Sequence, residues 1–208
     1  MHHGRLFTPN PLPAFTPTPN VTAPPTPLRT ASPIARPSEI TDQPSKQIHP
    51  YISWGFKIDD SIIYLSDVSF IPDDSILKSV SGTLPVFVLD CLHLVGHTSH
   101  FGLEEALDTA LKVAARRTYL TGFSHRVSHD EYVTLGKVIQ QGRNVVAVDM
   151  PQSSARVREG LELIKAYYAG PEQKASETEG IWLRPAHDGL RVFVSPDGVV
   201  NDETYDQT

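Results

Sequence analysis

The chain has 208 residues, a formal net charge of −6 and a pI near 5.8, so its charge excludes a footprint for non-specific nucleic-acid binding. A single cysteine, Cys91, excludes an intramolecular disulfide and fits a reducing compartment. No apolar run approaches the roughly 20 residues of a membrane helix, and the N-terminus lacks the apolar core of a secretory signal. We therefore expect one soluble intracellular domain with a tail, located in the cytoplasm and without a membrane partner.

Residues 1–50 hold about two-thirds of the chain's 18 prolines, interleaved with Thr, Ser and Ala. Such a segment has too little apolar surface to offset the entropy of ordering, so we expect it to be disordered or extended. A binding role through polyproline II conformation is the alternative, although linkers of this composition are common.

From residue 51 the pattern becomes globular, and a domain is predicted over residues 51–200. Residues 53–58 and 61–66 predict two strands of a hairpin, with Asp59-Asp60 as the turn. The second strand leads to Asp67. A carboxylate at the end of a buried strand is costly unless it is paired, hydrogen-bonded or metal-bound, and the plain alternative is a helix or turn cap. Residues 72–80 predict a short helix.

The stretch from Val86 to Asp130 predicts a βαβ unit and hence an α/β fold class. Residues 86–89 form a short β-branched and apolar run suited to a buried strand, and residues 118–120 predict the next strand. Between them, six apolar residues recur at helical spacing: Leu103, Ala106, Leu107, Ala110, Leu111 and Ala114. Ligands and catalytic groups of such units collect at the carboxyl ends of the strands.

Beyond this unit, residues 132–139 predict a helix, 144–148 a short strand and 156–168 an amphipathic helix. Asp188-Gly189 predicts a hairpin turn before a final strand. Residues 201–208 are polar and are expected to be a frayed tail.

Five of the nine histidines lie at the predicted strand ends, which raises a metal hypothesis. Their spacing alone does not establish it, because residues 97 and 100 share a loop and residues 125 and 129 fit a solvated helix start equally well. A Cys91–His nucleophile pair is a further alternative, but a buried free cysteine is usually packing. The five are His93, His97, His100, His125 and His129.

Several segments, taken in order over about residues 51–195, resemble the metallo-β-lactamase superfamily. The similarity is greatest to its phosphodiesterase branch, which includes cyclic phosphodiesterases and is related to ribonuclease Z. The segments are Tyr64-Leu65-Ser66-Asp67-Val68, Val88-Leu89-Asp90-Cys91, His100-Phe101-Gly102-Leu103-Glu104-Glu105-Ala106, Tyr119-Leu120-Thr121-Gly122-Phe123-Ser124-His125 and His187-Asp188-Gly189-Leu190.

The resemblance implies a metal-dependent hydrolase of phosphodiesters that uses zinc or manganese. It implies that Asp67 bridges two metal ions, that His100 contacts the scissile phosphate as a catalytic residue, and that His125 is a metal ligand. It also implies a partial αββα sandwich, mainly the C-terminal half of the family's domain. The remaining histidines of the stretch, His93, His97 and His129, are expected to be loop residues.

Two departures from the family pattern bear on function. The superfamily's His-x-His-x-Asp-His motif is absent, while Met1-His2-His3-Gly4 resembles a later segment with a metal-binding histidine, here His3. This predicts a chain that begins in mid-domain. In addition, Gly122 stands where many relatives place a ligand histidine, and His125 is the expected substitute.

These residues supply fewer than half of a dinuclear ligand set, so efficient catalysis by this chain alone is not expected. The alternative function is that of a non-catalytic remnant or truncated gene product of a metallo-hydrolase, acting as a binding protein. A lone half of the sandwich also exposes a sheet face, which predicts self-association or partner binding there.

Overall fold

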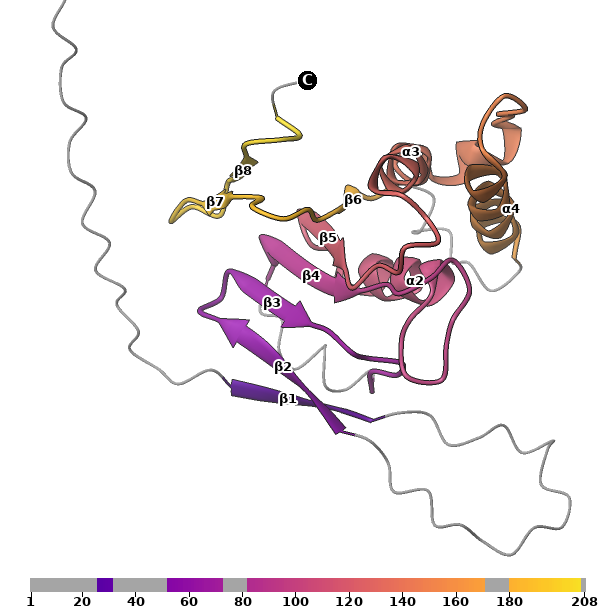
Figure 1. Ribbon diagram of the computed structural model, residues 1–208. Helices are drawn as coiled ribbons and strands as arrows, with labels where there is room; N and C mark the ends of the chain where they lie inside the picture. Colours follow the sequence, from indigo (N-terminus) through magenta and orange to yellow (C-terminus); the bar gives the residue numbers. More distant parts are fainter. Residues whose placement is uncertain (1–25, 32–51, 73–81, 171–179, 207–208) are drawn as a thin grey trace, which may run out of the picture.

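The computed structural model describes residues 26–31, 52–72, 82–170 and 180–206, and these build a six-stranded mixed sheet with helices (Figure 1). The α/β fold class is confirmed. The sheet has the order β1-β2-β3-β4-β5-β6, with antiparallel pairing from β1 to β3 and parallel pairing from β3 to β6. The strands are β1 Thr26–Ala31, β2 Ile52–Ile58, β3 Ile62–Leu65, β4 Val86–Asp90, β5 Arg117–Thr121 and β6 Leu183–Pro185.

The predicted βαβ unit is present. Strands β4 and β5 pair in parallel and are connected through α2 Leu103–Val113, whose buried residues have the expected helical spacing. Four of the five residues of β4 are buried, because α2 covers one face of the strand and the other face is also packed. The unit therefore fixes the carboxyl ends of β4 and β5 side by side.

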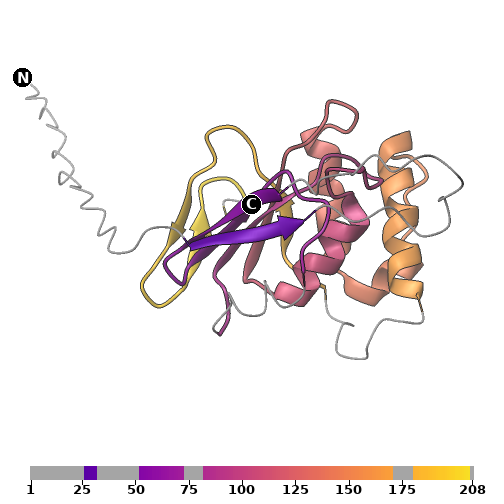
Figure 2. The same ribbon diagram turned by 90° about the horizontal axis from the view of Figure 1, so that it is seen from below.

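Three helices lie on one side of the sheet, as Figure 2 shows: α2, α3 His129–Ile139 and α4 Ala155–Ala169. Their apolar faces and the facing strand residues form the main core, which includes Phe87, Leu89 and Leu120 with no measurable exposure. The predicted helices over 132–139 and 156–168 are confirmed within slightly wider bounds. Among the described residues, none of the helices combines the length and the hydrophobicity that a membrane span requires.

A two-stranded ribbon, β7 Val192–Val194 and β8 Val200–Asp202, packs over part of the opposite face. Asp188-Gly189 does form a turn, since the Leu190 amide donates to the His187 carbonyl at 3.1 Å. The hairpin itself lies further on, however, where the Ser195 amide donates to the Val199 carbonyl at 2.9 Å. The expected final strand is thus followed by another.

Two predictions are wrong in this part of the chain. The strand expected at 144–148 is a 3-10 helix, η2 Gly142–Ala147, because Val145 alone of its valines is buried and it packs with α4 rather than with a strand. The frayed tail expected at 201–208 is ordered over 201–206, because Asp202 is buried and bonded there. Residues 207–208 lie outside the described part.

Within the segment expected to be disordered, the structure describes β1, which pairs with β2 as an edge strand. Pro27 fits such a position, because an edge strand does not need every backbone N–H. The rest of residues 1–50 and most of the predicted helix at 72–80 lie outside the described residues.

The sheet face opposite the helices is open over β2. Trp54, Phe56 and Ile58 alternate along this strand and are 54%, 42% and 51% exposed. Their register places Phe56 beside Tyr64 and Ile58 beside Ile62 of β3, so the exposed side chains continue into half-buried apolar ones. The exposed sheet face expected from the sequence is present.

The C-terminal ribbon is anchored by a buried carboxylate. Asp202 accepts hydrogen bonds from the Arg117 guanidinium at 2.6 Å and from the Tyr119 hydroxyl at 2.8 Å, and its side chain is fully buried. We expect Asp202→Ala to lower the free energy of unfolding by about 3 kcal/mol, because it leaves a largely buried guanidinium without this partner. Urea denaturation measures the change.

Glu203→Ala is the control for Asp202→Ala, since Glu203 is the next residue and its side chain pairs with Arg191 at 3.6 Å in an exposed position. Its effect is expected to stay within about 0.5 kcal/mol. Equal effects of the two substitutions would contradict the anchoring role of Asp202.

Glu131 connects the starts of two helices. Its carboxylate accepts from the Ser154 hydroxyl at 2.5 Å and from the Ser128 amide at 2.7 Å, and Ser154 is the N-cap of α4. These hydrogen bonds, the one from Ser154 first, hold the pKa of Glu131 below its usual value of 4.5. A carboxyl whose pKa is lower in the folded state stabilises the protein above its unfolded pKa.

We therefore expect the stability difference between the wild type and Glu131→Gln to be fully present at pH 7. It should shrink as the pH falls from about 5 towards 3, because protonation removes what the carboxylate contributes. Urea denaturation of both proteins over this range measures it. A difference that stays constant down to pH 3 would contradict the assignment.

Candidate functional site

The carboxyl end of β4 brings a carboxylate and an imidazole together. Asp90, the last residue of β4, accepts a hydrogen bond from the His100 Nδ1 at 3.0 Å and another from the Phe101 amide at 3.2 Å, both on Oδ2. With its proton on Nδ1, the His100 ring has Nε2 free to exchange a proton with another group. Asp90 can thus hold the His100 imidazole in the tautomer that carries its proton on Nδ1.

Asp90 is 1% exposed, which is a costly position for a carboxylate. Burial raises the pKa of Asp90, and the hydrogen bond and charge of His100 act in the opposite direction. His100 itself is partly open, with 22% of its side chain exposed. The arrangement is therefore a buried acid behind an accessible imidazole.

Asp67 reaches the same place from the neighbouring strand. It lies just beyond β3, its Oδ1 is 3.9 Å from the His100 Nδ1, and its side chain is 66% exposed. Its backbone is left-handed, with φ of 53°, a conformation that aspartate tolerates better than most residues. Two of the predicted site residues, Asp67 and His100, are therefore brought together.

The loop between β4 and α2 is held tightly enough to fix His100. The Leu92 amide donates to the Phe101 carbonyl and the Leu103 amide to the Leu94 carbonyl, each at 3.0 Å. Gly102 permits this crossing, because a Cβ there would lie 2.3 Å from the backbone nitrogen of Gly96. His100 is thus positioned by backbone contacts immediately before α2.

Gly122, the departure from the family pattern, lies directly beside Asp90. It has a φ of 82°, and a Cβ built on it would lie 2.7 Å from Asp90 Oδ1. A histidine at this position would therefore need Asp90 to shift. The observed position of the Asp90 carboxylate therefore requires a residue without a side chain at position 122.

The remaining candidate metal ligands are not joined to this pair. His125 is exposed in the loop after β5, and among the described residues no hydrogen bond or ion pair connects it to Asp67 or His100. His3 lies outside the described residues. Within the described ranges, no group of three or more His, Cys, Asp or Glu side chains is placed to hold a metal ion.

Two other histidines of the stretch, His93 and His129, lie in different places and have different partners. His93 Nδ1 lies 2.7 Å from the Ser124 hydroxyl, which connects the loops after β4 and β5. His129 is the first residue of α3, not a loop residue, and its Nε2 lies 3.1 Å from the Tyr205 hydroxyl.

Cys91 is fully buried, and burial raises the pKa of its thiol. A nucleophilic cysteine needs an accessible thiolate, so this geometry favours the packing role over the Cys–His alternative.

Asp90 is a site residue that the sequence patterns do not single out. A carboxylate at the end of a buried strand needs a partner, and Asp90, at 1% exposed, needs one more than the exposed Asp67 does. A signal was therefore present, but the identity of the partner, ten residues away, depends on the course of the loop.

The contact between Gly122 and Asp90 can be tested with a matched pair. Gly122→Ala and Gly189→Ala place a side chain at nearly the same positive φ, but no atom lies within 4 Å of the Gly189 Cβ position. We expect Gly189→Ala to cost about 1 kcal/mol and Gly122→Ala about 1–2 kcal/mol more, because Asp90 must move. Urea denaturation measures both, and equal costs would contradict the contact.

No family model matches the sequence, and no curated protein matches it. Among solved structures, the chain is similar to the crystal structure of a new diphosphatase from the PhnP family, with a TM-score of 0.47 and 21% sequence identity. The alignment covers 82% of this chain and 43% of that chain. The chain thus spans less than half the length of that diphosphatase.

Proposed function

We propose that this protein acts in the metal-dependent hydrolysis of phosphodiesters, as a protein of the metallo-β-lactamase type, with His100 as its proton-transferring residue. The observation that carries the proposal is the meeting of Asp67, Asp90 and His100 at the ends of β3 and β4. The order of the sequence segments that resemble the phosphodiesterase branch supports it independently.

In this proposal His100 protonates the oxygen that leaves the phosphorus. Asp90 accepts from Nδ1, which orients the ring, so that Nε2 is the atom that gives up its proton to the leaving group. Asp67 adds an accessible carboxylate on the same side of His100. General acid catalysis of this kind contributes about 10²–10⁴-fold to a rate.

The resemblance further implies zinc or manganese as the cofactor, with Asp67, His125 and His3 as ligands. A divalent ion would supply Lewis-acid stabilisation of the phosphate oxygens. The described residues do not by themselves make up such a site, because no three donors converge there. We therefore expect catalysis by the chain alone to be inefficient.

The second candidate function is that of a non-catalytic binding protein. The lack of a three-donor group among the described residues and the open face of Trp54, Phe56 and Ile58 favour it. In this case self-association through that sheet face is the expected property. Sedimentation tests it, and a chain that stays monomeric at high concentration would contradict it.

Hydrolysis of bis-p-nitrophenyl phosphate in the presence of Mn²⁺ or Zn²⁺ separates the two functions. If the hydrolase proposal is right, His100→Ala lowers the metal-dependent rate by about 10²–10⁴-fold and Asp67→Ala abolishes it. Asp149→Ala, at an exposed aspartate outside the site, serves as the control and should retain the rate.

Two outcomes would overturn the hydrolase proposal for this chain. One is the absence of metal-dependent turnover together with metal content near zero after dialysis. The other is a metal-dependent rate that His100→Ala leaves unchanged. Turnover that Asp67→Ala abolishes would instead overturn the non-catalytic alternative.

A further inference from the structure

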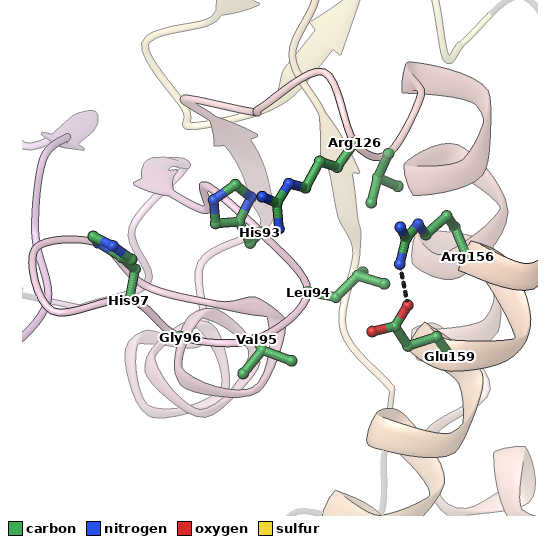
Figure 3. Close-up of a pocket in the computed structure, with 9 residues that line it drawn as sticks. His93, Leu94, Val95, Gly96, His97, Arg126, Arg156 and Glu159 are labelled. Atoms are coloured by element: carbon green, nitrogen blue, oxygen red, sulfur yellow. Dashed lines mark hydrogen bonds and ion pairs between the residues drawn. The ribbon is translucent and has the colours of Figure 1, made fainter.

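A second feature lies beside the Asp90–His100 pair. A cavity of about 360 Å³ opens between the loops that follow β4 and β5 and the first turn of α4 (Figure 3). This volume is within the range of small-molecule sites. Its lining residues are His93, Leu94, Val95, Gly96, His97, Arg126, Val127, Arg156 and Glu159.

The charge of this cavity is opposite to that of the protein. Its lining residues include two arginines, Arg126 and Arg156, and one carboxylate, Glu159, so these groups leave it net positive in a chain of net charge −6. Glu159 pairs with Arg156 at 2.7 Å. The cavity's carboxylate is thus paired with Arg156, whereas the guanidinium of Arg126 extends towards His93 in Figure 3.

The apolar surroundings of the cavity strengthen the interaction of its positive charge with a ligand. Leu94 and Val127 are buried, at 4% and 5% exposed, and give the cavity an apolar wall, which strengthens an electrostatic contact made against it. Burial and the nearby Arg126 lower the pKa of His93, which favours the neutral form of this ring. The arginines are the groups of the cavity whose positive charge is permanent.

One lining residue of the cavity, His97, is a neighbour of His100. The ring of His97 lies 6.4 Å from that of His93 inside the cavity and 6.4 Å from that of His100, measured between ring centroids. The backbone of His97 and His100 is joined by reciprocal hydrogen bonds of 3.0 and 3.4 Å. His97 thus lies between His100 and the His93 side of the cavity.

We propose that this cavity binds a phosphate group, with Arg126 as its principal contact and Arg156 as a second one. Guanidinium groups present paired N–H donors that match phosphate oxygens, and their charge does not depend on pH in the physiological range. Resting on the proposed function, the group bound there is a second phosphate of a substrate whose reacting phosphodiester lies at His100.

The test titrates the full chain with inorganic phosphate and monitors binding in ¹H–¹⁵N spectra. Phosphate should shift the amide signals of residues 93–97 and 126–127 in a saturable manner. Arg126→Gln should weaken this binding at least tenfold, whereas Arg116→Gln, at an exposed arginine outside the cavity, should leave it unchanged. Thermal melting verifies that both variants are folded.

A second pair of variants tests the sign of the charge effect. Glu159→Gln removes the only carboxylate among the cavity's lining residues and should tighten phosphate binding several-fold. Glu162→Gln, on the same helix and paired with Lys165 at 3.2 Å, lies outside the cavity and should change nothing. A purely structural role of Glu159 would not strengthen binding.

The proposal is overturned if phosphate produces no saturable shifts, if Arg126→Gln and Arg116→Gln bind equally, or if Glu159→Gln weakens binding. Failure of the hydrolase proposal is a separate result. Asp67→Ala would then lack any rate to lose, while phosphate would still bind the wild type and Asp67→Ala alike through Arg126.

Discussion

The buried carboxylate of Asp90 is the constraint on which the arrangement at this end of the sheet depends. A carboxylate at the end of a parallel strand must find donors or bear a large desolvation cost. Here the donors come from His100 and the Phe101 amide, so the loop after β4 has to return to the strand before α2 can begin. The close approach of Gly122, the residue after β5, belongs to the same arrangement. A single buried acid thus connects two strand ends and a helix start.

The other sheet face is organised around a second buried carboxylate. Asp202 accepts from Arg117 and Tyr119 of β5, and its backbone amide donates to Asp206 at 2.7 Å. This holds the β7–β8 ribbon over one part of the face and leaves the part over β2 open. The carboxyl ends of β3 and β4 carry the candidate site, while the face that the ribbon partly covers has an uncovered apolar area. These two regions therefore offer different kinds of surface to a ligand or partner.

The sequence predicts well those elements whose burial follows a local period. The spacing of Leu103, Ala106, Leu107 and Ala110 predicts α2, and the β-branched run at residues 86–89 predicts β4. The prediction for residues 144–148 fails because an apolar run of this length fits either a strand or a short helical turn. Only the packing of the segment against α4 decides between the two. The prediction for residues 201–206 fails because their polar composition suggests fraying. Asp202 is instead buried, with hydrogen-bond partners more than eighty positions earlier in the chain.

The candidate site was predictable in part for the same reason. Histidines at strand ends and the resemblance of short segments identify His100 and Asp67. The partnership of His100 with Asp90, and the cavity lined by Arg126 and Arg156, require loops from separate elements to meet. Nothing in the local sequence around either arginine indicates that they line one cavity.

The position of Cys91 has an experimental consequence. It is the chain's one thiol, it follows Asp90 directly, and its amide donates to the Thr121 carbonyl at 2.9 Å. A thiol with no exposed surface reacts with an alkylating reagent only when the surrounding structure opens. The alkylation rate of the unmodified protein therefore reports how often the ends of β4 and β5 separate. The chain carries its own probe of motion at the candidate site, and no label has to be introduced.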